Sequence, residues 1–385
     1  MRRVLALILV FVITMVARGS EEQLKIVPAS EVLHNISLGN PLEYDNCIIT
    51  GDLNLNKLEV KGGIHFNKTI FRDSVYSRST KFSGIADFSS STFSGDVKFC
   101  DSTFDDDAYF SYATFKKLAF FENSTFNGDA DFFYSTFNDN ARFCYSTFKE
   151  FAFFENSTFN GDADFFYSTF KGYVFFENVT FHGKLGLTGT SYNRLYVRWN
   201  NIKKCLFYDD SSYLVIIKNF KDLGYFEDSD NCYFQYRKDR RGQPWPCDYP
   251  LEEPARKFID FLAEWSYGYG TRPANPFIWS LLLILLFGLT WRYLGFNNGR
   301  NDGSNRSNLR SILIALKPFG FSAAVFLSSV WFLGGWFLIG IPEIPDMPGR
   351  SKCLAKHIFS LERILGAIFT GLFLLAISRT VIRAA

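Results

Sequence analysis

The segment STFNGDADFFY, residues Ser124–Tyr134, decides the fold because it recurs unchanged at Ser157–Tyr167. From Phe82 to Phe181, phenylalanines alternate between steps of six and five along the chain. The repeating unit is therefore an 11-mer, and a fixed repeat of this kind is typical of a solenoid. The predicted core ladder consists of Phe82, Phe88, Phe93, Phe99, Phe104, Phe110, Phe115, Phe121, Phe126, Phe132, Phe137, Phe143, Phe148, Phe154, Phe159, Phe165, Phe170, Phe176 and Phe181.

A second regularity is a small residue two positions before most ladder phenylalanines, as with Ser124 before Phe126 and Ala130 before Phe132. One large and one small inward residue per five or six positions fits a square coil. Four faces then need two of the 11-mer units for each coil. The 3.6-residue period of helical repeats is absent from this segment, and so are the Leu and Asn landmarks of leucine-rich repeats.

At these residues the sequence resembles the pentapeptide-repeat family, whose motif is small–polar–Leu/Phe–x–x. The strings STFxx and ADFFY match this motif, and each unit carries one extra residue between phenylalanines such as Phe126 and Phe132. A weaker start lies upstream in IITGDLNLNKLEVKGGIHF, residues 48–66. The resemblance implies an all-β right-handed quadrilateral β-helix, which we expect over residues 46–205. We expect a small helical hairpin and an α-helical transmembrane region to follow.

Composition and charge limit the classes of function. Phe accounts for 45 of the 385 residues, and the net charge of +2 gives no overall bias toward nucleic acid. Between Thr80 and Phe181, 15 acidic side chains outnumber 7 basic ones, a local balance of −8. The four histidines are scattered, and the sequence carries no metal-spaced cluster, phosphate-binding loop or nucleophile elbow. We therefore expect a protein without catalytic activity, cofactor or metal.

The N-terminus has the three-part layout of a secretory signal. Arg2 and Arg3 precede the apolar run Val4–Val16, and Ala17 and Gly19 suit cleavage before residue 21. We predict a signal peptide over residues 1–20, with an uncleaved anchor as the alternative. In either case the following segment leaves the cytoplasm.

Downstream of the repeats, residues 206–275 are expected to form a helical hairpin and a juxtamembrane linker. Hydrophobic spacing predicts two helices between Tyr213 and Arg237 that close the open end of the solenoid. Gly224 suits the end of the first helix, and Asp228 or Asp230 suits the cap of the second. The string YRKDRRGQPWP, residues 236–246, is interpreted as a basic loop.

Residues 276–385 are expected to cross the membrane. The apolar segments 277–294, 319–341 and 358–378 each approach or exceed the roughly 20 residues that a spanning helix needs. The connection 300–317 carries four Lys or Arg and one Asp, which favours its placement in the cytoplasm. With three spans, the solenoid then lies outside.

The region from the first span to the tail resembles the two-span-plus-pore-loop, ion-channel-like region attached to some pentapeptide-repeat membrane proteins. FSAAVFLSSVW, residues 321–331, stands where a pore helix would. The potassium filter TVGYG is replaced by FLGG, residues 332–335, so the resemblance implies a degenerate pore. The segment 319–341 could therefore span the membrane or re-enter it.

Outward-facing phenylalanines are the candidate binding residues of the solenoid. They either cover the edges of the ladder or form an exposed strip for a partner. These residues are Phe120, Phe133, Phe153, Phe166 and Phe175.

Two further pairs of residues are candidates for a special role. Glu362 and Arg363 are ionisable residues inside an apolar segment, either functional or an interfacial pair, and adjacent helix positions keep them from facing each other. Cys232 and Cys247 are the predicted disulfide, because the loop between them is short enough to fold back and close.

These patterns support three hypotheses. The first is a multi-pass cell-membrane protein with an extracytoplasmic, non-catalytic solenoid that binds or scaffolds an unidentified protein or glycan. The second is a degenerate ion-channel-like or sensor protein with the solenoid as its soluble domain. The third, brought in by the family resemblance, is an acidic nucleic-acid mimic, which the export signal disfavours, so we expect no nucleic acid partner. Homo-oligomerisation through the transmembrane region is a further expectation.

Overall fold

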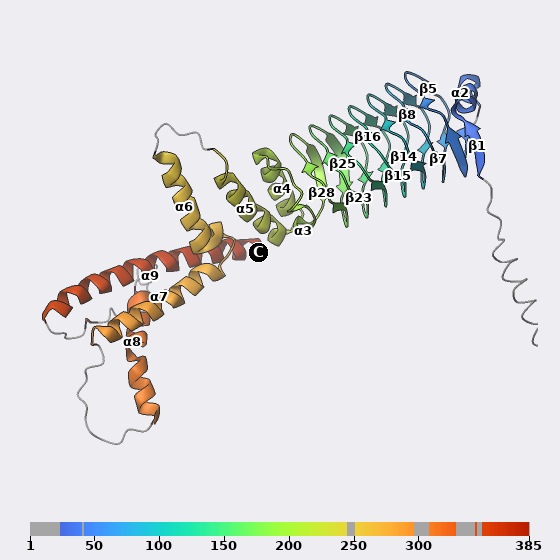
Figure 1. Cartoon of the computed structure of the whole chain (residues 1–385). Coiled ribbons are helices and arrows are strands. Elements are labelled where there is room, and N and C mark those ends of the chain that lie inside the picture. Colours follow the sequence, from blue (N-terminus) through green and yellow to red (C-terminus); the bar gives the residue numbers. More distant parts are fainter. Residues whose placement is uncertain are drawn as a thin grey trace, which may run out of the picture. The chain divides into compact units, whose positions relative to one another are not determined.

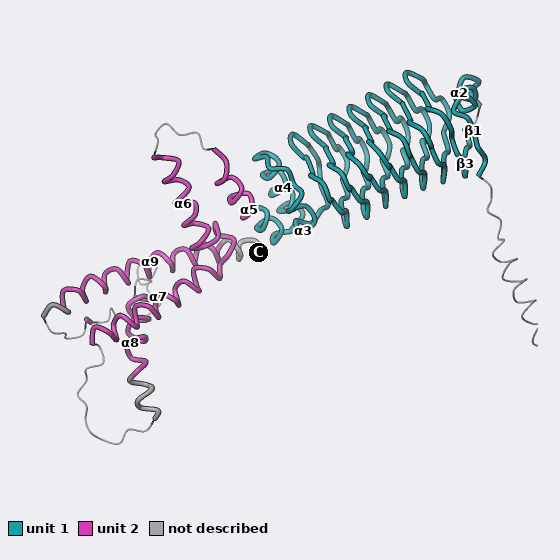
Figure 2. The backbone as a smooth tube through the Cα atoms, in the orientation of Figure 1, with its two compact units in different colours: residues 1–232 teal, residues 233–385 magenta. Residues whose placement is uncertain are grey.

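The computed structural model describes residues 24–40, 42–244, 251–295, 308–328, 343–344 and 349–384. The chain divides into two compact units, Met1–Cys232 and Tyr233–Ala385 (Figure 2). The predicted signal peptide, residues 1–20, lies outside the described residues.

Unit 1 is a solenoid of short parallel strands stacked coil upon coil (Figure 1). One face is an eight-stranded sheet: β1 (Lys25–Pro28), β3 (Cys47–Thr50), β7 (Ile70–Phe71), β11 (Thr92–Phe93), β15 (Thr114–Phe115), β19 (Thr136–Phe137), β23 (Thr158–Phe159) and β26 (Thr180–Phe181). A seven-stranded sheet forms another face: β4 (Leu53–Asn54), β8 (Val75–Tyr76), β12 (Val97–Lys98), β16 (Ala119–Phe120), β20 (Ala141–Arg142), β24 (Ala163–Asp164) and β27 (Leu185–Gly186).

The remaining two faces belong to one 13-stranded sheet, because the long strand β25 (Thr169–Phe175) continues around a corner and pairs on both. One of these faces contains β2 (Leu42–Glu43), β6 (Ile64–His65), β10 (Ala86–Asp87), β14 (Ala108–Tyr109), β18 (Ala130–Asp131) and β22 (Ala152–Phe153). The other contains β5 (Glu59–Val60), β9 (Lys81–Phe82), β13 (Thr103–Phe104), β17 (Thr125–Phe126) and β21 (Thr147–Phe148). The last strand, β28 (Ser191–Tyr196), pairs with β25.

The strand register confirms a square coil made of two 11-mer units. Ala119 pairs with Ala141 and Ala141 pairs with Ala163, all in parallel. In the central coils, neighbours within a sheet are four strands apart in sequence, so each of these coils supplies one strand to each face. The strands extend upstream of the predicted start at residue 46, because β1 and β2 pair with the first coils.

The ladder phenylalanines fill the axis of the solenoid. Those from Phe82 to Phe176 are buried, whereas Phe181, at the end of the ladder, is partly exposed. Rings one coil apart stack, as in Phe143 with Phe121 and Phe165, both at 4.9 Å between ring centroids. Rings on neighbouring faces meet edge to face, the other arrangement that aromatic pairs favour.

The small inward residues let successive coils approach, and several of their hydroxyl groups are paired, although Ser77 and Ser135 Oγ have no partner among the described residues. The alanines are fully buried, as at Ala130 and Ala141. Ser124 Oγ donates to the carbonyl of Phe99 at 2.6 Å, and Thr80 Oγ1 donates to the carbonyl of Leu55 at 2.8 Å. A buried hydroxyl needs such a partner, since leaving it unpaired would cost about 1–3 kcal/mol.

The two corners of each 11-mer unit differ. One corner places a residue at positive φ once in every unit, for example Tyr134 at 54° and Tyr145 at 59°. The other contains the extra residue and runs so close to the preceding coil that several units have a glycine there. A Cβ added to Gly161 would lie 2.5 Å from the carbonyl carbon of Asp139.

Helices close both ends of unit 1. Helix α2 (Ala29–Leu38) lies over the first coil and contacts β4. At the other end lie α3 (Trp199–Ile202), α4 (Asp210–Asp222) and the start of α5 (Phe226–Arg241). The carboxamide of Asn219 on α4 accepts from the amide of Leu195 at 3.0 Å and donates to its carbonyl at 2.8 Å. Asn219 therefore pairs with the last strand as a further strand would.

Two predictions for the hairpin were wrong. Helix α5 begins at Phe226, so Asp228 and Asp230 lie inside the helix and do not cap it; Asp228 is buried and pairs with Arg198. The basic segment is not a loop up to Arg241, because α5 continues through it. Arg237, in this helical part of the segment, pairs at 2.5 Å with Asp260 of the next helix, α6 (Glu252–Tyr267).

The rest of unit 2 is helical. After α6 come η1 (Gly268–Gly270), α7 (Ala274–Tyr293), α8 (Asn308–Ser328) and α9 (Gly349–Ala384). Within the described residues, two helices are long and apolar enough to cross a membrane, α7 and the segment Lys352–Ser378 of α9. The predicted middle span, 319–341, is described only as far as Ser328, within α8.

Candidate functional site

The structure divides the five candidate phenylalanines between two faces. Phe120 and Phe166 lie on the face built from β16 and β24, whereas Phe133, Phe153 and Phe175 lie on the face built from β18, β22 and β25. All five are half-buried. They form no single strip, so the two groups need separate consideration.

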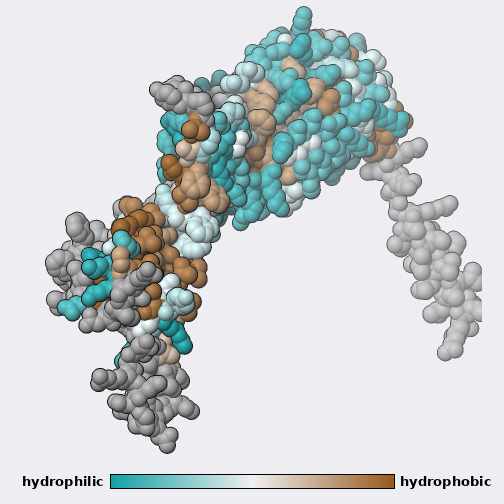
Figure 3. Space-filling view, turned by 60° about the vertical axis from the view of Figure 1, so that its left-hand side comes forward, coloured by the Kyte–Doolittle hydropathy of each residue, from teal (hydrophilic) through white to brown (hydrophobic). Residues whose placement is uncertain are grey.

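A cluster of aromatic rings lies on the second face near the C-terminal end of the solenoid. Phe153 stacks on Phe175 at 5.2 Å, and Phe175 stacks on Tyr196 at 5.0 Å. Phe151, which is 39% exposed, and Tyr173 form a second row with their ring centroids 5.7 Å apart. Hydrophobic patches are visible on the mostly hydrophilic solenoid in Figure 3. The ladder pattern alone did not reveal Phe151, Tyr173 or Tyr196, although Phe151 precedes an inward Ala in the repeat.

Carboxylates continue this face toward the N-terminus. The backbone amide of Phe133 donates to Asp131 at 2.8 Å, and that of Phe151 donates to Asp129 at 3.0 Å. Glu155 follows on the next coil, and its buried Oε2 has no hydrogen-bond partner among the described residues. We name this surface the aromatic–acidic face; it comprises Asp107, Tyr109, Asp129, Asp131, Phe133, Phe151, Phe153, Glu155, Tyr173, Phe175 and Glu177.

Three ionisable groups of this face, Tyr109, Asp131 and Glu155, have raised pKa values. Burial raises the pKa of Asp131, and the charge of Asp129 adds to the effect. Burial likewise raises the pKa of Glu155, with the charges of Glu177 and Asp131 adding to it. The hydrogen bond that Tyr109 donates to Asp107, at 2.9 Å, raises the tyrosine pKa to about 12. Burial and neighbouring carboxylates therefore both disfavour the charged forms of Asp131 and Glu155.

The opposite face neutralises its own carboxylates. Arg142 lies 3.6 Å from Glu122 and 4.0 Å from Asp164, and its guanidinium lies 5.2 Å from the Phe120 ring centroid. Lys98 similarly lies 4.0 Å from Asp96. Charged groups of both signs and aromatic rings are thus combined on that face within the protein itself.

Comparison with known proteins agrees with this architecture. A family model described as pentapeptide repeats (9 copies) matches residues 66–114 and 145–191. The solenoid is built of pentapeptide repeats. No curated protein and no solved structure matched the chain. The matched residues lie within the pentapeptide-repeat solenoid, and the ion-channel-like resemblance of the helical region stays a prediction.

Exposed tyrosines mark two corners of the pentapeptide-repeat solenoid. Tyr112 stacks on Tyr134 at 5.2 Å, and Tyr145 stacks on Tyr167 at 5.2 Å. All four rings are exposed, and all four residues have positive φ. The repeat period could have located them, because each one directly follows an outward residue and precedes an inward serine or alanine.

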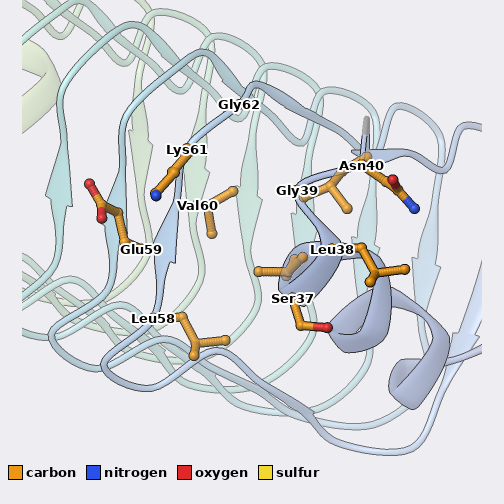
Figure 4. Close-up of a pocket in the computed structure, with 11 residues that line it drawn as sticks. Ser37, Leu38, Gly39, Asn40, Leu58, Glu59, Val60, Lys61 and Gly62 are labelled. Carbon is orange, nitrogen blue, oxygen red and sulfur yellow. The ribbon is translucent and has the colours of Figure 1, made fainter.

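A groove of about 430 Å³ lies at the N-terminal end of the solenoid, between residues 36–40 at the end of α2 and residues 58–62 around β5 (Figure 4). Strand β5 pairs only with β9 among the described strands, so one of its edges faces this groove. The charged side chains of Glu59 and Lys61 flank that edge, as charged residues often do to discourage further strand pairing.

Glu362 is a polar centre of unit 2. Its side chain is 0% exposed and accepts hydrogen bonds from Trp291 Nε1 of α7, at 2.8 Å, and from Ser322 Oγ of α8. Arg363 points elsewhere, with its guanidinium 5.9 Å from the Phe359 ring centroid. Three helices therefore enclose Glu362, and both interpretations of the Glu362–Arg363 pair, functional or interfacial, stay predictions. Its partners come from other helices and could not be found from the sequence around it.

No metal centre is evident in the described part of the chain, where no group of three or more His, Cys, Asp or Glu side chains could hold an ion.

Cys232 is buried with a free thiol, whereas Cys247 lies outside the described residues. The Cys232–Cys247 bridge thus stays a prediction. Peptide mapping without reduction should yield a linked pair of peptides, and recovery of both as free thiols would contradict it. Cys100 and Cys144 serve as the control. They lie two coils apart, about 9–10 Å at the strand spacing, which is too far for a disulfide.

Proposed function

We propose that this protein is a non-catalytic binding or scaffold protein whose pentapeptide-repeat solenoid carries the binding surface. The observation that supports this proposal is the aromatic cluster of Phe151, Phe153, Tyr173 and Phe175 on one solenoid face. Rings that point away from the core contribute little to folding, and exposed apolar patches typically mark interaction sites. The folded ladder is complete without these rings.

We further propose that the apolar helices anchor the protein in the cell membrane with the solenoid outside the cytoplasm. Helices α7 and α9 have the required length and composition. The signal-like start and the basic connection 300–317 agree with this orientation.

Protease added to intact cells should therefore digest the solenoid. A solenoid that is cleaved only after lysis would contradict the proposed orientation. An antibody against the solenoid, used on blots of treated and untreated cells, measures the difference, and a cytoplasmic protein serves as the control for cell integrity.

The binding function can be tested by photo-crosslinking in cells. A benzophenone amino acid replaces Phe153 in one variant and Phe120 in a matched variant, because both follow a buried alanine at the same place in the repeat, on different faces. We expect discrete crosslinked species from position 153 and none from position 120. Absence of crosslinks at both positions, or the same species at both, would contradict the proposed surface.

A further inference from the structure

We propose that the aromatic–acidic face binds the lysine and arginine side chains of a basic polypeptide segment. This inference rests on the proposed binding function and adds the chemical class of the partner. Three observations carry it: the distribution of charge on the face, the cations that occupy equivalent places elsewhere in the solenoid, and the closed backbone of the face.

The face has acidic and aromatic side chains but lacks basic ones along its central coils. Its outward positions from Asp107 to Glu177 include neither lysine nor arginine. Asp129, Asp131 and Glu155 make no ion pair among the described residues, and Phe133 and Phe153 lie beside them. Carboxylates next to aromatic rings are the combination that recognises a cationic side chain.

Elsewhere in the solenoid, arginine side chains lie beside comparable aromatic rings and carboxylates. At the end of the aromatic cluster, the Arg194 guanidinium lies 5.6 Å from the Tyr173 ring centroid. On the opposite face, Arg142 contacts both the Phe120 ring and two carboxylates. The central coils of the aromatic–acidic face repeat the rings and the carboxylates without the cation. A cation from a partner would complete the arrangement.

Electrostatics and strand pairing further restrict the chemical class of the partner and the way in which it can bind. A cation beside these residues would favour the charged forms of Asp131 and Glu155, whose pKa values burial raises. Nucleic acids and other polyanions would be repelled. The strands of this face are paired on both sides from β6 to β25, so an added strand finds no free edge there and recognition must use side chains.

The test uses the full-length protein in detergent and a fluorescent dodecapeptide of alternating arginine and serine. A control peptide carries citrulline in place of arginine, which keeps the side-chain length and replaces the charged guanidinium by a planar, neutral urea group. We expect the arginine peptide to bind at least tenfold more tightly than the citrulline peptide in fluorescence anisotropy. Equal affinities would overturn the inference.

Two matched triple variants distinguish binding by the aromatic–acidic face from attraction by the net charge of the protein. Asp129→Asn, Asp131→Asn and Glu155→Gln remove three charges from the aromatic–acidic face, and Asp96→Asn, Glu122→Gln and Asp164→Asn remove three from the opposite face. We expect at least tenfold weaker binding from the first variant and less than twofold change from the second. Equal weakening would mean bulk charge attraction and would overturn the inference.

Additional controls keep the outcomes distinct. Asn and Gln preserve a hydrogen-bond acceptor, and hydrogen exchange of strand amides confirms that each variant is folded. A single variant, Phe153→Leu, should also weaken binding, because it stays apolar and loses the ring.

Crosslinks from position 153 in cells without any preference for the arginine peptide would refute the cationic partner and leave the proposed binding function intact. Tight arginine-peptide binding without crosslinks would show that the face recognises cationic side chains and would contradict the proposed binding function in cells.

Discussion

Replacing Phe143 by alanine should destabilise the solenoid by about 3–5 kcal/mol, the usual cost for a buried phenylalanine. The ring is fully buried and stacks on Phe121 and Phe165, each 4.9 Å away. It also meets Phe132 and Phe154 edge to face. The smaller side chain would leave a cavity in the axis that stacked coils cannot close without shifting their paired strands.

The measurement is hydrogen exchange of the strand amides in the full-length protein, which reports the local free energy of opening. The matched control is Phe133→Ala, one residue beyond an inward position, where the ring is half-buried and contacts Tyr112 and Tyr134. We expect that variant to lose about 1 kcal/mol or less, because surface substitutions cost little. Equal losses would refute the assignment of inward and outward positions.

Replacing Asn219 by leucine should open the C-terminal end of the solenoid. The carboxamide pairs with both the amide and the carbonyl of Leu195, and all these groups are buried. Leucine has the same branching at Cγ but no polar atoms, so it leaves two buried backbone groups unpaired. At about 1–3 kcal/mol for each group, we expect a loss of about 2–6 kcal/mol.

The loss should appear as faster exchange confined to β28 and the coil beneath it. Asn193→Leu is the control, because Asn193 lies on the same strand and is exposed. Uniform acceleration along the whole solenoid would show that the end does not open separately. An unchanged rate at Leu195 would show that the carboxamide pairing does not protect this strand.

The repeat made the solenoid predictable, because inward positions must return at every fifth or sixth place to fill the axis. Downstream of the repeats, single residues that mark helix ends were weaker guides to the structure. Gly224 correctly indicated the end of α4, since its φ is +74°, but Asp228 is used in an ion pair instead of a cap.

The candidate surface was only partly predictable. The sequence pattern identified Phe133, Phe153 and Phe175 as outward-facing. It did not separate them from Phe120 and Phe166, which lie half a coil away on the opposite face. Phe151 and Tyr173 join the aromatic–acidic face through ring contacts between neighbouring coils, and a linear sequence pattern does not reveal such contacts. Partners of Glu362 come from helices distant in sequence.

The coil of two 11-mer units gives the near-identical segments 113–145 and 146–178 a geometric consequence. Each segment holds three units, so the shift between them is one and a half coils, and the second copy is advanced along the axis and turned by half a revolution. The two copies of STFNGDADFFY are thus related by an approximate screw operation, and Phe133 and Phe166 point in opposite directions. Duplication by an odd number of units therefore displays the same motif on both sides of the rod, whereas duplication by an even number lengthens one side's array.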